Sequence, residues 1–71
     1  MARSVKEKRI MQTVVCISIR ESMPDAIKIG TKYKIDLSTA WGDLEGEWYV
    51  TTYSMDGTRI GQMNLKHFRS E

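Results

Sequence analysis

The apolar residues of this chain recur at every second position in short runs, and this alternation limits the fold more than any other feature. Over residues 31–37, Tyr33, Ile35 and Leu37 alternate with charged residues. A period of two places apolar side chains on one face of a half-buried strand. Three further strands are predicted, over residues 10–20, 47–53 and 58–63. No segment sustains the apolar 3.6-residue period of a helix, so the pattern predicts an all-β domain.

Segment 10–20 is rich in β-branched residues, which favour strands because they pack well on a pleated surface. The face of this strand predicted to be buried is the odd one, which carries Met11, Thr13, Val15, Ile17 and Ile19. Pro24 then interrupts the pattern and predicts a loop. Two glycines and two acids predict an irregular loop over 38–46. Asp56-Gly57 predicts a hairpin turn, and Asn64 can cap a short 3-10 turn.

The length of 71 residues leaves room for one small domain and excludes a two-domain enzyme. Cys16 is the only cysteine, so an internal disulfide is excluded and a cytoplasmic protein with a reduced thiol is expected. No run of 18 apolar residues is present, and we predict no membrane association.

Basic residues are concentrated at the N-terminus. Residues 1–9 are predicted to form a flexible basic tail with a net charge of +3, from Arg3, Lys6, Lys8 and Arg9 against Glu7. The remaining 62 residues are nearly neutral. The four basic residues could contact nucleic-acid phosphates, which is the alternative function considered below. No basic stripe is predicted elsewhere, because Lys32 and Lys34 share a strand face that lacks the ring of Tyr33.

No catalytic or metal site is predicted. Cys16 and His67 are the only pair that could supply a nucleophile and its base, and no third orienting group is indicated. The carboxylates of Asp43, Glu45 and Glu47 lack the residue order of a calcium loop. We therefore expect a protein that is not an enzyme and has neither a cofactor nor a bound metal.

The second half of the chain, from Ile27 onward, resembles a Src-homology-3 (SH3) domain. Residues 27–35 resemble its diverging turn and second strand, and residues 45–50 resemble the double-aromatic start of its central strand. Asp56-Gly57 lies where the distal hairpin would turn, and residues 64–68 correspond to the closing 3-10 turn. The resemblance implies a small five-stranded SH3-like barrel over residues 10–71, with a short 3-10 turn near the C-terminus.

The resemblance also implies a binding surface, although the proline-binding signature is mostly absent. The first strand lacks the family's aromatic motif, and only Trp48 matches the aromatic shelf; His67 falls near the shelf's tyrosine. Alternation alone would bury Trp48 and Val50, whereas the SH3 register turns Trp48 outward and sends Tyr49 and Thr51 inward. We adopt the SH3 register, because it leaves an aromatic side chain for binding.

The predicted function is therefore a non-enzymatic module that binds another protein. Aromatic side chains dominate interface energetics, and an acidic rim suits a basic partner. The candidate binding residues are Trp41, Trp48, Asp43, Glu45, Glu47 and His67. Free-standing domains of this kind resemble small bacterial or bacteriophage accessory proteins. A second copy of the chain is a further candidate partner, through pairing of the long first strand.

Overall fold

The chain forms five antiparallel strands in one sheet, as the computed structural model of residues 9–71 shows. The elements are β1 Met11–Cys16, β2 Lys32–Gly42, β3 Trp48–Ser54, β4 Arg59–Asn64, the 3-10 turn η1 Leu65–His67 and β5 Phe68–Ser70. The predicted all-β class, with five strands and a short turn near the C-terminus, is confirmed. Of the predicted basic tail, only Arg9 belongs to the described residues.

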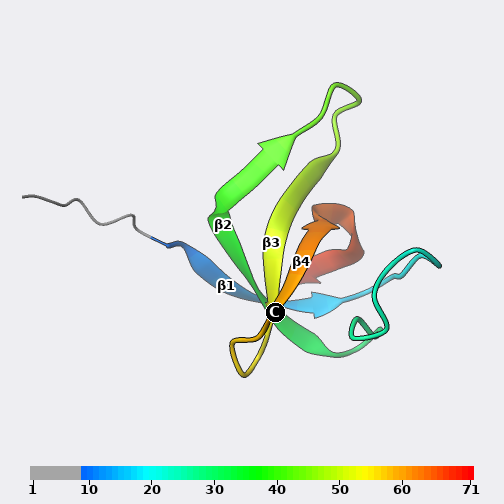
Figure 1. Ribbon diagram of the computed structural model, residues 1–71, viewed down its shortest axis with the longest axis vertical. Helices are drawn as coiled ribbons and strands as arrows, with labels where there is room; N and C mark the ends of the chain where they lie inside the picture. The colour runs from blue at the N-terminus through cyan, green and yellow to red at the C-terminus, as the bar shows by residue number, and fades with distance from the viewer. Residues whose placement is uncertain (1–8) are drawn as a thin grey trace, which may run out of the picture.

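The strand order is β4-β3-β2-β1-β5, so each of the first four strands pairs with its neighbour in sequence and β5 returns to β1 (Figure 1). The first half of β2 pairs with both β1 and β3, whereas its end pairs with β3 alone. The register of β2 with β3 shifts between Asp36 and Trp41, and β2 bends along its length (Figure 1). Such irregularities bend a strand and change the direction of the residues that follow.

The core lies on the face formed by alternate residues of the three central strands. Tyr33 and Phe68 meet edge to face, with ring centroids 6.0 Å apart. The Tyr33 hydroxyl also donates to the carbonyl of Ala26 at 2.7 Å and accepts from the amide of Lys28 at 2.8 Å, which ties the long 17–31 segment to the sheet. The buried apolar residues are Val14, Cys16, Ile27, Tyr33, Ile35, Val50, Met63 and Phe68.

The predicted buried face of the first strand is wrong. Val14 and Cys16 are buried, whereas Ile17 and Ile19 are about half exposed and lie beyond the end of β1. The register with β2 places Val14 opposite Tyr33, whose side chain is part of the core. Because a shift of one residue exchanges the two faces of a strand, this long-range pairing reverses the assignment made from apolar residues alone.

Two further assignments around the aromatic residues are changed. Residues 38–42 belong to β2 and are not loop, so Trp41 is a strand residue. Trp48 is exposed, as the adopted register predicts, but Val50 is fully buried and Tyr49 is only half-buried. Thr51 is buried as expected. The burial of β3 therefore follows simple alternation at Val50 and the SH3 register at Trp48 and Thr51.

The first strand is not a free edge. β1 pairs with β2 on one side, and Val14 to Cys16 pair with β5 on the other. The edges of the described sheet are β4 and β5. Pairing of a second copy along the first strand, as the sequence suggested, would therefore compete with β5.

Candidate functional site

The connection between β2 and β3 is a tight loop organised by Asp43. Its Oδ1 accepts hydrogen bonds from the amides of Glu45 at 2.9 Å and Glu47 at 3.0 Å, and its Oδ2 accepts from the Tyr49 hydroxyl at 3.0 Å. The amide of Glu47 is the main cause that lowers the pKa of Asp43. Gly46 has φ of 88°, a left-handed conformation that favours glycine. The Asp43 carboxylate therefore stabilises the loop by accepting hydrogen bonds from residues of the loop and of β3.

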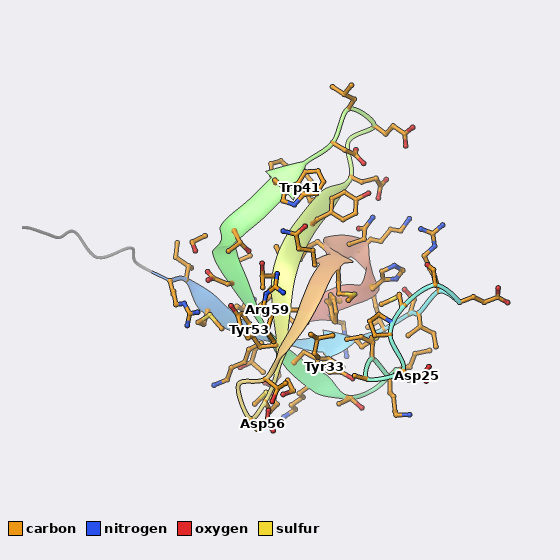
Figure 2. The ribbon with its side chains drawn as sticks, in the orientation of Figure 1. Asp25, Tyr33, Trp41, Tyr53, Asp56 and Arg59 are labelled. Carbon is orange, nitrogen blue, oxygen red and sulfur yellow. The ribbon has the colours of Figure 1, made fainter. Side chains whose placement is uncertain are left out.

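Trp41 and Tyr49 form a fixed but exposed aromatic pair. They are direct cross-strand partners, and their rings stack with centroids 4.7 Å apart at an angle of 30°. The indole Nε1 of Trp41 also donates to Oε1 of Gln62 on β4 at 3.2 Å. Trp41 nevertheless keeps 45% of its surface exposed. Figure 2 shows it near the end of β2, below the loop. We call Trp41, Leu44, Glu45, Tyr49 and Gln62 the Trp41 surface.

Trp48 lies on the other face of the same hairpin. Its cross-strand partner is Gly42, the pair next to Trp41 and Tyr49, and successive pairs of a ladder point to opposite faces. The Trp48 ring lies over Gly42, where a Cβ atom would be 3.3 Å from Cε2 of the indole. Trp48 is 53% exposed and borders a shallow cavity of about 380 Å³ with Leu65 and Lys66. The two tryptophans therefore do not form the single surface that the sequence suggested.

The acidic residues predicted to form one rim do not share one surface either. Glu47 accepts from Nδ2 of Asn64 at 2.7 Å and lies 3.7 Å from Nζ of Lys66, so it ties the hairpin to η1. Asn64 also caps η1 by accepting from the amide of Lys66, as predicted. Glu45 is exposed, and Leu44 beside it is fully exposed at the loop tip. Glu45 is the rim carboxylate that the loop leaves at the surface.

His67 is buried, and it lines a cavity of about 250 Å³ together with Tyr49 and Gln62. Its Nδ1 and Oγ of Ser18 are joined by a hydrogen bond of 2.9 Å. Burial lowers the pKa of His67 below 6.5, and the charges of Lys66 and Arg20 act in the same direction. Within residues 9–71, no carboxylate is hydrogen-bonded to this imidazole. The Ser18–His67 pair is a contact that fixes the 17–31 segment against η1.

A group of basic residues surrounds Tyr53 on the sheet face that points away from the core. Lys34 and Arg59 are the direct cross-strand partners of Tyr53. The guanidinium of Arg9 lies 5.6 Å from the Tyr53 ring centroid. The expectation of no basic stripe with a stacking ring was therefore wrong, because the ring comes from another strand. We call Arg9, Lys34, Tyr53 and Arg59 the Tyr53 face. Of the tail residues proposed for nucleic acid, Arg3, Lys6 and Lys8 lie outside the described part of the chain.

The described part of the chain offers little support for other kinds of site. Residues 9–71 contain no group of three or more His, Cys, Asp or Glu side chains placed to hold a metal ion. No helix in that range is long and apolar enough to cross a membrane. The candidate residues that the sequence did not reveal include Gln62, Tyr53 and Arg59, because contacts between strands bring Gln62 to the Trp41 indole and Arg59 beside Tyr53.

Comparison of the chain with protein-family models, with curated proteins and with solved structures finds no match.

Proposed function

We propose that the protein is a non-enzymatic, cytoplasmic interaction module with an SH3-like fold that binds a partner protein through the Trp41 surface. The observation that carries the proposal is that Trp41 is held in place by Tyr49 and Gln62 yet remains 45% exposed. A side chain that is already ordered loses less conformational entropy when a partner covers it. Large aromatic side chains of this kind are the residues that most often anchor protein interfaces.

The charge around Trp41 favours a partner segment that carries arginine. The loop 43–47 contains three acids and no base. The Trp41 and Tyr49 rings offer a π surface on which a guanidinium can stack, and Glu45 can pair with its charge. Leu44, at the loop tip, adds an apolar contact. An arginine beside an aliphatic residue is therefore the partner chemistry that this surface fits.

Three features support the SH3-like part of the proposal. The 3-10 turn lies between the last two strands, where the resemblance expects it, and the turn at Gly57 lies where the distal hairpin is expected. Trp48 at the start of the central strand is exposed. A role as a small bacterial or bacteriophage accessory protein is consistent with one compact binding domain.

Site-specific photocrosslinking tests the proposal. A photoreactive amino acid at Leu44 is expected to give a covalent adduct with a partner protein from the native cell, and mass spectrometry would map the adduct to an arginine-bearing segment. Trp41→Ala in the same chain should remove the adduct, because the stacked ring is lost. Circular dichroism checks that this variant is folded.

The control places the photoreactive residue at Ile29, another exposed apolar position, in the 17–31 segment. No adduct with the same partner is expected from that position. If the Leu44 adduct persists in Trp41→Ala, or if Ile29 gives the same adduct, the Trp41 surface is not the binding site.

A further inference from the structure

The Tyr53 face is a separate surface with its own charge and geometry. Tyr53 on β3 has Lys34 of β2 on one side and Arg59 of β4 on the other, and direct cross-strand partners point to the same face. Figure 2 shows Tyr53 and Arg59 close together over the central strands. Val50 and Thr52, the core residues of β3, point the opposite way. The half-buried ring is therefore flanked by two cations on the solvent side of the sheet.

Arg9 adds a third cation, and it is held in place. Its Nη2 donates to the Tyr53 hydroxyl at 3.4 Å, and its Nε lies 3.8 Å from Oδ2 of Asp36. Asp36 is only 3% exposed, and its Oδ1 accepts from Ser38 and from the amide of Ile10. The carboxylate thus anchors Arg9 from beneath the surface, whereas the Arg9 side chain remains 62% exposed.

Asp36 offsets the charge of Arg9, whereas the other two cations of this face have no ion-pair partner among the described residues. Among residues 9–71, neither Lys34 nor Arg59 is in an ion pair, whereas Lys32 is paired with Glu71. Asp56, the nearest acid along the chain to Tyr53 and Arg59, accepts hydrogen bonds from the Ser54 hydroxyl and the Thr58 amide within its own turn.

We propose that the Tyr53 face binds single-stranded nucleic acid. Surfaces that bind single strands combine cations for the phosphates with aromatic rings on which bases stack, and Arg guanidinium planes also stack on bases. Here Lys34 and Arg59 contact phosphates, and a base stacks on the Arg9–Tyr53 pair. A double helix fits less well, because Lys34, Tyr53 and Arg59 lie side by side on neighbouring strands of a sheet and not on a helix that could enter a groove. An acidic protein would use the cations but not the ring.

Fluorescence anisotropy with a short labelled oligothymidylate tests the proposal over a range of salt concentrations. The double variant Lys34→Gln/Arg59→Gln should bind about tenfold more weakly or worse at low salt. Its log–log salt slope should fall by about 1.4, because each lost phosphate contact removes about 0.7 from the slope for a single strand. Tyr53→Leu should also bind about tenfold more weakly, with the slope unchanged, because stacking is lost and charge is not.

Three control variants show whether binding depends on the ring and on the position of the charges. Tyr53→Phe keeps the ring but removes the hydroxyl that accepts from Arg9, so it should lose much less affinity than Tyr53→Leu. Arg20→Gln/Lys28→Gln removes the same charge from the 17–31 segment and should weaken binding much less than the test pair. Trp41→Ala should leave oligonucleotide binding unchanged, which keeps this result independent of the proposed protein-binding site. Circular dichroism confirms that each variant is folded before its affinity is compared.

Four results would overturn the proposal. The first is no binding of oligothymidylate by the unmodified chain at low salt. The second is an equal loss of affinity in the Arg20→Gln/Lys28→Gln control. The third is a loss in Trp41→Ala without a loss in Tyr53→Leu, which would move the binding to the Trp41 surface. The fourth is binding of polyglutamate that competes fully with the oligonucleotide while Tyr53→Leu has no effect, which would make the face a site for acidic proteins.

Discussion

Asp36 and His67 are the buried polar side chains whose protonation links the fold to pH. Oδ1 of Asp36 accepts hydrogen bonds from the hydroxyl of Ser38 at 2.6 Å and from its amide at 3.0 Å. The Ser38 hydroxyl is the main cause that lowers the pKa of Asp36 below 3.8. Since the ionised form is favoured in the fold, its contribution to stability is complete above that value and is lost as the pH falls through the folded pKa. Protonation of Asp36 therefore reduces the stability of the fold only when the pH falls below 3.8.

Burial lowers the pKa of His67 below 6.5, so this residue changes the stability of the fold in a different pH range from Asp36. Below 6.5, the unfolded chain binds a proton at this imidazole more readily than the folded chain does, and the free energy of unfolding falls as the pH is lowered. We predict that the chain is less stable at about pH 5.5 than at about pH 7.5, as measured by urea unfolding. His67→Asn keeps a polar group near Ser18 without the titration, and it should remove most of this difference. Equal stability of the unmodified chain at both pH values would contradict the prediction.

The β2–β3 hairpin shows how one carboxylate shapes an element. Asp43 holds two loop amides and the Tyr49 hydroxyl, and through Tyr49 it supports the ring under Trp41. The hydrogen bond to the Asp43 carboxylate is also the main cause that raises the pKa of Tyr49 above 10.0. The position of the exposed Trp41 ring therefore depends on Asp43, a loop residue that is not the cross-strand partner of Trp41.

Asp43→Asn tests this dependence. The Asn oxygen can keep the two loop hydrogen bonds, but its NH₂ group takes the place of Oδ2 and cannot accept from the Tyr49 hydroxyl, and the charge is also lost. The pKa of Tyr49 should therefore fall toward 10.0. The measurement is an NMR titration of ¹³C-labelled tyrosine, with Tyr49→Phe to assign the resonance. An unchanged Tyr49 pKa in the variant would show that the carboxylate does not control the ring.

Sequence patterns identify the strands well but identify their faces only where one face is clearly polar. Residues 31–37 alternate apolar and charged side chains, and the predicted burial of Tyr33 and Ile35 is correct. Residues 10–20 offer apolar side chains on both faces, so alternation cannot choose between them. The choice is made by pairing with Tyr33 and Phe68, which are far away in sequence. Long-range register is the information that local patterns lack.

The candidate sites show the same limit. Both tryptophans are exposed as the sequence suggested, yet they point to opposite faces because Trp41 and Trp48 belong to successive cross-strand pairs. Glycines at 42 and 46 suggested a loop, but the irregularity after Asp36 lets β2 continue to Gly42. Tyr53 and Arg59 meet through a second register shift, at Thr52 and Tyr53 of β3. None of these juxtapositions has a signature within a single segment.

At the scale of the whole molecule, charge is separated along one sheet face. Tyr49 and Tyr53 share the solvent side of β3, since they are an even number of residues apart. The acids of loop 43–47 lie at the Tyr49 end, whereas Lys34 and Arg59 pair with Tyr53. The two proposed partners, a basic protein segment and a nucleic-acid strand, would therefore be attracted to different ends of this face. A net charge of +2 conceals this arrangement.

The edges of the sheet determine whether two copies of the chain can join. β5 has three residues, and β4 carries the Arg59 charge and a register shift beside Gly61, whose φ is 145°. Short edges, charges and bulges all discourage pairing between sheets. We therefore predict a monomer of 8.2 kDa at micromolar concentrations, as measured by sedimentation equilibrium. Hydrogen exchange provides an independent check, because the outward amides of β4 should exchange rapidly in a monomer. A sedimenting mass of two chains, with those amides protected, would identify β4 as a dimer interface and contradict the prediction.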